Sequence, residues 1–272
     1  MRRNATEWAW LEFAGQECPH AAPRVLALDR RRGMFAMEYL EPARYPVWKQ
    51  LLLDGVVDPG VAASVAIVLA RLHASTAAKE EIAARFATGR DFQALRLDPY
   101  LLEAARRNPD VSTVLRELAA RTLATNLALT HGDVSPKNIL VGPDGPVFLD
   151  PETAWYGDPA FDLAFCLNHL LLKCLARPQC SDAYLDCYAA LRSHYLSDVA
   201  WERASDLERR AAHLLPALLL ARVDGKSPVE YLTERDRPFV RKTACALIQG
   251  PPSQLSEIAG IWRKAISLRG PQ

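Results

Sequence analysis

Apolar residues recur at helical spacing along most of the chain, which predicts a mainly α-helical protein. The first such segment covers residues 4–14, where Trp8 and Leu11 follow the helical repeat and Gly15 is expected to end the helix. A second begins at Asp58 and Pro59, a capping residue followed by a proline, and runs to about residue 77. Further helices are predicted near residues 91–107, 110–126, 160–176, 182–197, 201–222, 235–249 and 254–267.

Two regions depart from this helical pattern and predict β-strands. Residues 25–29 and 34–40 are short apolar runs joined by the polar turn of residues 30–33. Residues 139–141 and 147–149 flank Gly142-Pro143-Asp144-Gly145, whose composition is typical of a tight turn. The second pair predicts a β-hairpin inside a helical domain, and loops that adjoin such hairpins often carry function.

The composition is that of an ordinary globular protein. With 33 Lys and Arg against 32 Asp and Glu, the net charge of +1 gives no basic excess for binding nucleic acid. The longest apolar run, roughly residues 211–221, is too short to cross a membrane, and no signal peptide is visible. We therefore expect a cytoplasmic protein with neither nucleic acid nor membrane as partner. The six cysteines form no C-x-x-C pair, and the oligomeric state is left open.

Chemically active residues are concentrated on both sides of the predicted central hairpin. Residues 131–138, His-Gly-Asp-Val-Ser-Pro-Lys-Asn, precede it, and Asp150-Pro151-Glu152 follows. Because a hairpin returns the chain to its starting point, Asp133, Asn138 and Asp150 should meet at one end. Their oxygens suit Mg²⁺, and phosphoryl transfer uses one Asp to orient the acceptor hydroxyl. The alternative is a Ser-Pro turn with an Asx cap, which leaves the spacing to Asp150 unexplained.

The order H-G-D-x-x-x-x-N, hairpin, D-x-E and G-D-P-x-x-D-L-A resembles the aminoglycoside phosphotransferase family, a branch of the protein-kinase-like fold. Residues 150–162 are similar to the methylthioribose kinase branch of that family. The resemblance implies an α+β, protein-kinase-like fold, with a reduced N-lobe and hinge at residues 1–40 and a mostly helical C-lobe at residues 41–272. It implies ATP-dependent phosphorylation of a hydroxyl on a small metabolite or sugar, with Mg²⁺.

The same resemblance implies roles for individual residues around the hairpin. Asp133 is the expected catalytic base, and Asn138 and Asp150 are the expected Mg²⁺ ligands. Glu152 either assists the metal or the substrate, or has a structural role. Lys137 either touches the transferring phosphate or is a solvated loop lysine.

Two further segments match family positions near the N-terminus. Glu38, Tyr39 and Leu40 match the hinge, whose backbone would hydrogen-bond adenine. Glu7 matches the glutamate that pairs with a phosphate-binding lysine, but the first lysine of the chain is Lys49, beyond the hinge.

The remaining polar residues have simpler explanations. Asp158 and Asp162 are expected to cap the helix near residue 160, His73 to be a core histidine, and His131 to support the catalytic loop. The charged group Arg222, Asp224 and Lys226 falls where related enzymes place substrate contacts, although a charged helix end is the default interpretation.

The glycine-rich loop that grips nucleotide phosphates in this family is not found before the hinge. Only Gly15 and Gly33 precede residue 38, so no G-x-G-x-x-G motif is possible there. One hypothesis is an N-terminally truncated small-molecule kinase, and another is a pseudokinase that binds nucleotide or metabolite without transfer. A third is an aminoglycoside-resistance kinase, whose polycationic substrate needs an acidic pocket.

Overall fold

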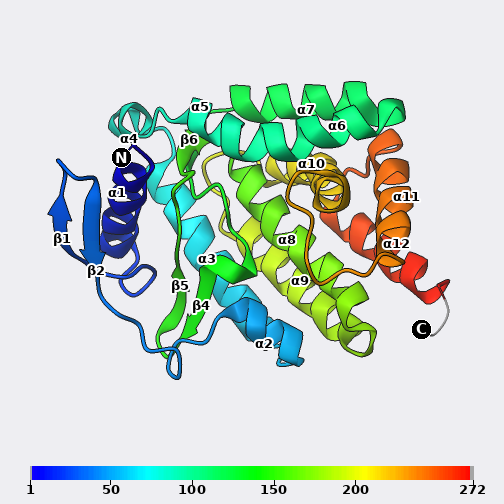
Figure 1. Cartoon of the computed structure of the whole chain (residues 1–272), viewed down its shortest axis with the longest axis horizontal. Helices are drawn as coiled ribbons and strands as arrows, with labels where there is room; N and C mark the ends of the chain where they lie inside the picture. The colour runs from blue at the N-terminus through cyan, green and yellow to red at the C-terminus, as the bar shows by residue number, and fades with distance from the viewer. Residues whose placement is uncertain (1, 270–272) are drawn as a thin grey trace.

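Helices make up most of the molecule, and the strands form short two-stranded sheets (Figure 1). The computed structural model describes residues 2–269. Within them the α+β class predicted from the sequence is confirmed: a small N-terminal part lies beside a large helical part. The boundary between these two parts at residue 40 stays a prediction.

The N-terminal part consists of one helix and one antiparallel hairpin. Helix α1 (Arg2–Glu17) continues past Gly15, so the predicted stop at that residue is wrong. Strand β1 (Val25–Asp29) pairs with β2 (Met34–Met37), as the sequence predicts, but β2 is shorter than expected. Residues 38–40 therefore lie outside the strand, although the Glu38 N–H still donates to the Arg24 carbonyl at 2.9 Å.

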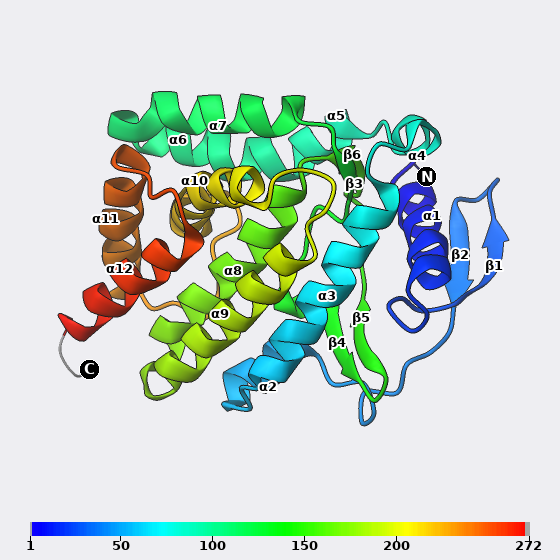
Figure 2. The ribbon, with the colours of Figure 1, turned by 180° about the vertical axis from the view of Figure 1, so that it is seen from behind.

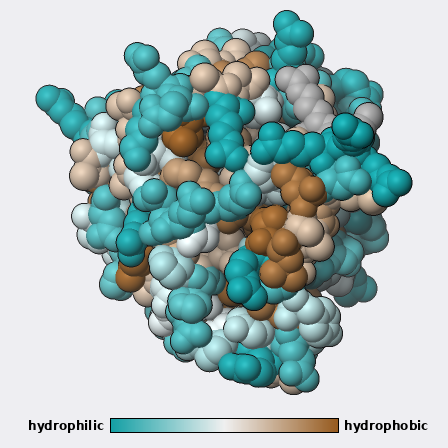
Figure 3. Space-filling view, turned by 90° about the vertical axis from the view of Figure 1, so that its left-hand side faces the viewer, coloured by the Kyte–Doolittle hydropathy of each residue, from teal (hydrophilic) through white to brown (hydrophobic). Residues whose placement is uncertain are grey.

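The hairpin and α1 differ in how they contact the rest of the molecule. Trp10, Leu11 and other side chains of α1 are buried in the same apolar core as the C-terminal helices. By contrast, Leu26, Met34 and Met37 of the hairpin are 56%, 53% and 45% exposed. Figure 3 views the molecule from this side, where brown apolar atoms emerge among teal polar ones. Helix α1 thus connects the N-terminal part to the core.

Most of the predicted helices are confirmed with ends within a few residues. Asp58 caps the first of them, accepting the Gly60 N–H at 2.8 Å, with Pro59 at the first helical position. The helices that match predictions are α3 (Pro59–Thr76), α7 (Ser112–Ala124), α8 (Pro159–Ala176), α9 (Ser181–Ser197), α10 (Ala204–Asp224), α11 (Asp236–Gln249) and α12 (Leu255–Ser267).

The predicted helix at residues 91–107 is not a single α-helix. It comprises α5 (Gly89–Phe92), a wider π-helical segment η1 (Gln93–Leu102) and α6 (Glu103–Arg107). Pro99 lies inside η1, and proline lacks the N–H that a regular α-helix needs at this position. The irregular segment is relevant to the site because it carries Arg96.

Short elements were missed by the helical and strand patterns. They are too short to show a full period of apolar residues. They are α2 (Trp48–Asp54), α4 (Glu80–Arg85), the 3₁₀ turns η2 (Pro109–Val111), η3 (Pro136–Asn138) and η4 (Pro178–Cys180), and the paired strands β3 (Ala128–Thr130) and β6 (Trp155–Gly157).

Helix α8 is the central element of the helical part. It packs against α9 and α10, and α9 packs in turn against α3, beside which it lies in Figure 2. Helices α3 and α8 are long and apolar enough to cross a membrane by length and composition alone, but 94% of the α8 segment is buried inside the protein. Burial of this kind is typical of a core helix.

Candidate active site

Two loops lie side by side because each of them connects the same two small sheets. Strands β3 and β6 pair at Thr130 and Trp155, and the predicted hairpin of β4 (Ile139–Gly142) and β5 (Gly145–Phe148) is confirmed. The segment of residues 131–138, called here the catalytic loop, therefore lies beside residues 149–154. The Leu149 N–H donates to the Asn138 carbonyl at 2.8 Å, which joins the two segments.

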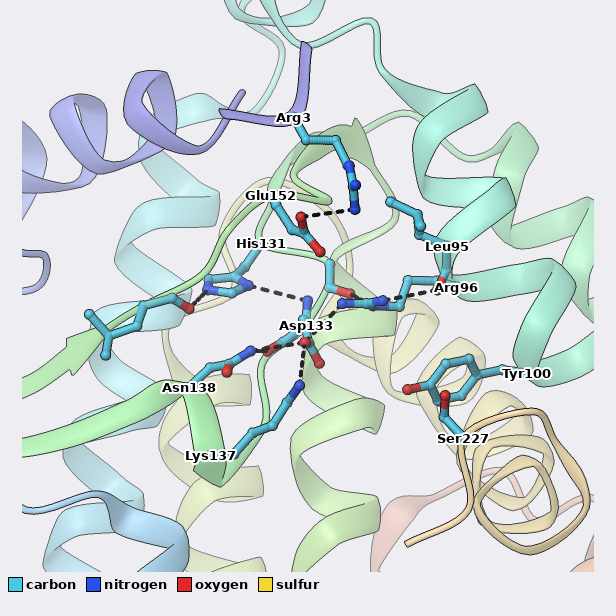
Figure 4. Close-up of polar contacts among 12 residues, drawn as sticks. Arg3, Leu95, Arg96, Tyr100, His131, Asp133, Lys137, Asn138, Glu152 and Ser227 are labelled. Carbon is cyan, nitrogen blue, oxygen red and sulfur yellow. Dashed lines mark hydrogen bonds and ion pairs between the residues drawn. The ribbon is translucent and has the colours of Figure 1, made fainter. Parts of the chain in front are cut away.

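The Asp133 carboxylate is the centre of the polar network in the catalytic loop. It is only 2% exposed, and Asn138 Nδ2 donates to its Oδ2 at 2.9 Å. Arg96 Nη2 and Lys137 Nζ lie 2.8 and 3.3 Å from the same oxygen. Figure 4 shows these three side chains reaching the carboxylate from different directions. The geometry fixes the carboxylate while leaving Lys137 partly exposed.

Arg96 is a site residue that the sequence patterns do not indicate. Its Nε donates to the Gly132 carbonyl at 2.9 Å and its Nη1 to the Leu95 carbonyl at 2.9 Å, while Nη2 pairs with Asp133. The guanidinium thus ties η1 to both the backbone and the carboxylate of the catalytic loop. Arginine supplies several donors in one plane, which suits this arrangement.

His131 supports the catalytic loop, as predicted. Its Nδ1 accepts the Asp133 N–H at 3.2 Å, so Nε2 carries the proton and donates to the Leu149 carbonyl at 3.1 Å. Burial lowers the pKa of His131, which keeps the ring neutral. The ring also contacts Trp10 of α1 edge-on, with 4.9 Å between centroids.

The predicted capping role of Asp162 is wrong, whereas that of Asp158 is confirmed. Asp158 accepts the Ala160 N–H at 3.0 Å at the start of α8. Asp162, fully buried, instead accepts the N–H groups of His131 and Gly132 at 2.7 and 2.9 Å. Its sequence position near a helix start gave no sign of a partner some thirty residues away.

His73 joins the same buried network. Its Nε2 lies 3.2 Å from Asp162 Oδ2 and its Nδ1 2.7 Å from the Tyr195 hydroxyl. Both ring nitrogens therefore have partners, which confirms the predicted core histidine. The chain Tyr195–His73–Asp162 anchors the start of the catalytic loop to α3, α8 and α9.

Gly132 occupies a position that only glycine fits. Its φ of +78° is in the left-handed region, and an added Cβ would lie 2.6 Å from the Thr153 carbonyl oxygen. The close approach lets the catalytic loop lie directly against residues 149–154.

Acidic residues gather where the hairpin ends. Asp150 has a φ of +60°, a conformation that Asp tolerates better than most residues and that is often found at functional sites. Burial, with Glu152 and Asp133 nearby, raises its pKa. Burial and the same group of acids, Asp150 and Glu152, raise the pKa of Glu7 to about 7. Glu152 pairs with Arg3 at 3.2 Å (Figure 4), so its side chain connects to α1.

This acidic excess fits a divalent cation. Burial and, to a lesser extent, mutual repulsion raise the pKa values of Asp150 and Glu7, and a bound cation would relieve both effects. The Asn138 side chain uses its amide nitrogen for its hydrogen bonds, which leaves the carbonyl oxygen as a hard ligand. Within residues 2–269, no three His, Cys, Asp or Glu side chains form a metal site by themselves, so a metal here would need Asn138 or ligand oxygens as well.

Other predicted residues lie farther from this network. Tyr39 is 83% exposed, and Glu38 accepts the Arg24 N–H at 2.9 Å. Asp224 pairs with Arg241, as expected for a charged helix end. Leu40 is half-buried, and its predicted contact with adenine is a matter for experiment.

The six cysteines all lie within the described residues and are free. Of these, Cys18, Cys166, Cys174 and Cys187 are buried.

The helical lobe, the catalytic loop, the hairpin and the acidic loop together have the arrangement of a protein-kinase-like fold. The sequence profile of the phosphotransferase enzyme family (APH) matches residues 2–194, more than half of the chain, so the chain belongs to that family. This confirms the resemblance found in the motifs.

Curated relatives include several methylthioribose kinases. Methylthioribose kinase 1 of Oryza sativa subsp. japonica is 27% identical over 182 residues, which cover 57% of this chain and 42% of the relative. Methylthioribose kinase of Yersinia enterocolitica is 27% identical over 189 residues, covering 60% and 47%. The chain thus spans less than half the length of these relatives.

Solved structures with similar folds share less sequence. A choline/ethanolamine kinase family protein from Mesorhizobium loti has a TM-score of 0.49 and 17% identity, covering 96% of this chain and 84% of that one. The streptomycin-ATP-APH(2")-IIa ternary complex has a TM-score of 0.47 and 14% identity, covering 92% and 81%. Similarity at this level carries no information on the substrate.

Proposed function

We propose that this chain belongs to an ATP-dependent, cytoplasmic kinase that phosphorylates a hydroxyl of a small metabolite or sugar. The observation that carries the proposal is the buried Asp133 carboxylate, fixed by Arg96 and Asn138 beside the acidic loop of Asp150. Membership of the phosphotransferase enzyme family supports the reaction class, and relatives named methylthioribose kinase support a sugar-like acceptor.

Different residues of the chain position the reacting groups and transfer the proton. Asp133 accepts a hydrogen bond from the acceptor hydroxyl and takes its proton as the new oxygen–phosphorus bond forms, the bond from the γ-phosphorus to the bridging oxygen breaks, and ADP leaves. Arg96 and Asn138 hold that carboxylate in one orientation, and His131 and Asp162 hold the loop that carries it. Lys137, beside Asp133, is placed to stabilise negative charge on the transferring phosphoryl group.

Asn138 and Asp150 are the residues that would hold Mg²⁺, with Glu152 close by. When bound, Mg²⁺ neutralises phosphate charge and orients the phosphoryl group of ATP. We propose that the backbone of Glu38, Tyr39 and Leu40 holds the adenine.

Two variants separate the metal role from the proton role. Asp150→Ala should abolish Mg²⁺-dependent nucleotide binding, because it removes a carboxylate that would hold the metal needed to neutralise the phosphates. Asp133→Asn should leave nucleotide binding within about twofold and lower turnover by roughly 10²–10⁴-fold, the usual contribution of a general base. Calorimetry with Mg·ADP and ADP release over a panel of small hydroxylated metabolites measure the two effects.

The controls are the unaltered chain and Asp144→Asn, which lies in the exposed turn of the hairpin. ADP release is measured on this chain and on any longer in-frame form of it. Loss of nucleotide binding in Asp133→Asn, with normal binding in Asp150→Ala, would show that the two roles are assigned wrongly.

A further inference from the structure

A small cavity lies next to Lys137 of the catalytic loop. Its volume is about 30 Å³, room for one or two water-sized groups. Its walls come from α2, the catalytic loop, α8, the end of α10 and the loop that follows. The lining residues are Lys49, Pro136, Lys137, His169, Lys173, Arg222, Glu230 and Tyr231.

The charges around this cavity are unbalanced. Lys49 pairs with Glu230, and Lys137 pairs with Asp133. Neither Lys173 nor Arg222 has a carboxylate partner among residues 2–269. Two of the four cationic side chains that line the cavity therefore have no direct ion-pair partner among the described residues, and Glu230 is the one carboxylate in the lining.

Lys173 is the more unusual of the two. Its side chain is fully buried on α8, and its Nζ has no hydrogen-bond partner within the described part of the chain. The Nζ lies 4.6 Å from the centre of the Tyr231 ring, which is a favourable but weak contact for a cation. A buried ammonium without a hydrogen-bonded partner is costly, so an anion in the cavity would supply what the protein does not.

Arg222 contributes a second unused donor. Its Nη1 donates to the Tyr100 hydroxyl at 3.0 Å and to the Ser227 carbonyl at 2.6 Å, and Figure 4 shows these two partners side by side. Its Nε is buried without a hydrogen-bond partner among the described residues. Both unpartnered nitrogens belong to side chains that line the same cavity.

We propose that this cavity binds an anionic group, a carboxylate or a phosphate, on the acceptor molecule whose hydroxyl is oriented by Asp133. The proposal rests on the proposed function and names its substrate class. Lys137 connects the two places, since it both lines the cavity and contacts Asp133 at 3.3 Å. The acceptor is then a small hydroxy acid, sugar acid or sugar phosphate, and a polycationic aminoglycoside does not fit this lining.

Binding of a simple anion tests the cavity without nucleotide or turnover. Sulfate and acetate are titrated separately, against sodium chloride at equal ionic strength, while thermal unfolding is followed. At about a hundred times its dissociation constant, a bound anion should raise Tm by roughly 5–10 °C. Sulfate as the better ligand indicates a phosphate group, and acetate indicates a carboxylate.

The decisive comparison is between Lys173→Met and Lys264→Met. Lys264 is exposed on α12, so its variant should keep the whole shift. Lys173→Met should lose the shift and still fold, because it replaces an unpartnered buried charge by an apolar chain of similar length. General stabilisation by sulfate would affect both variants equally.

The binding should also depend on pH in a defined direction. Burial, together with Lys49 nearby, lowers the pKa of Lys173 to about 7. Sulfate keeps its charge between pH 6 and 9, so its affinity should fall, by up to about tenfold per pH unit, as Lys173 deprotonates above pH 7. Lys173→Met should remove this dependence. The groups facing Lys173 are Lys49, Cys166, His169, Arg222, Glu230 and Tyr231.

Matched acceptors test the same idea in the reaction. Glycerol, glycerate and glycerol 3-phosphate are compared by ADP release, with an expected preference of at least about tenfold for a charged acceptor. Lys173→Met should lose that preference through a higher KM for the charged acceptor.

The proposal would be overturned if Lys173→Met kept the full sulfate-induced rise in Tm, or if saturating Mg·ADP abolished that rise in the unaltered protein. Either result would leave the kinase function intact. A Lys173-dependent shift with no ADP release from any acceptor would support the anion site and contradict the kinase function.

Discussion

Asp133 is held by side chains that come from different parts of the sequence. Asn138 and Lys137 belong to its own loop, but Arg96 arrives from η1. Because catalysis of phosphoryl transfer depends on positioning, the residue that fixes the proposed base should affect turnover strongly.

We expect Arg96→Lys to lower kcat by about 10²-fold, because lysine keeps the charge but loses the planar set of donors. Nucleotide affinity should stay within about twofold, since within residues 2–269 the hydrogen bonds and ion pair of Arg96 join it to the catalytic loop and to its own helix. ADP release under saturating nucleotide measures the effect, and Arg90→Lys, exposed on α5, is the control. Equal turnover in the two variants would remove Arg96 from the site.

Residues in the site differed in how far they could be predicted. Asp133, Asn138 and Asp150 follow from spacing, because a hairpin must bring its two ends together. Arg96 and Lys173 do not, because each lies in a helix and reaches the site only through tertiary packing. For Lys173, the available signal was a charged residue within the mainly apolar sequence of α8.

Helices and strands likewise differ in how well the sequence predicts them. Long amphipathic helices such as α3 and α9 are predicted well, since their length shows the apolar period several times. The π-helical segment η1 and strands β3 and β6 were missed, because their form depends on neighbours distant in sequence. Asp162 illustrates the point: its helix was predicted, but its contact with the catalytic loop was not.

Asp162 should therefore contribute to stability more than a surface carboxylate. Asp162→Asn replaces one acceptor oxygen by an NH₂ group that cannot accept from the loop. Loss of one charge-assisted bond and weakening of another should lower the free energy of unfolding by about 2–4 kcal/mol. Asp144→Asn, in the exposed hairpin turn, should change it by less than about 0.5 kcal/mol. Urea denaturation followed by circular dichroism measures both, and equal stabilities would contradict the anchoring role.

At the scale of the whole molecule, the question is whether residues 1–40 behave as a separate unit. The hairpin is largely exposed, but α1 inserts Trp10 into the common core, where its ring contacts His131. The catalytic loop is thus supported from the N-terminal part as well as from α8. A shared core favours one cooperative transition over two.

Trp10→Ala tests this coupling. Removing a large buried aromatic side chain should lower the free energy of unfolding by about 3–5 kcal/mol. Because the core is continuous, tryptophan fluorescence and far-ultraviolet circular dichroism should report the same lowered midpoint in denaturant. Trp8→Ala, on the same helix but only partly buried, should have a smaller effect. Two separate transitions, with the C-terminal helices unaffected by Trp10→Ala, would instead show that residues 1–40 fold independently of the catalytic lobe.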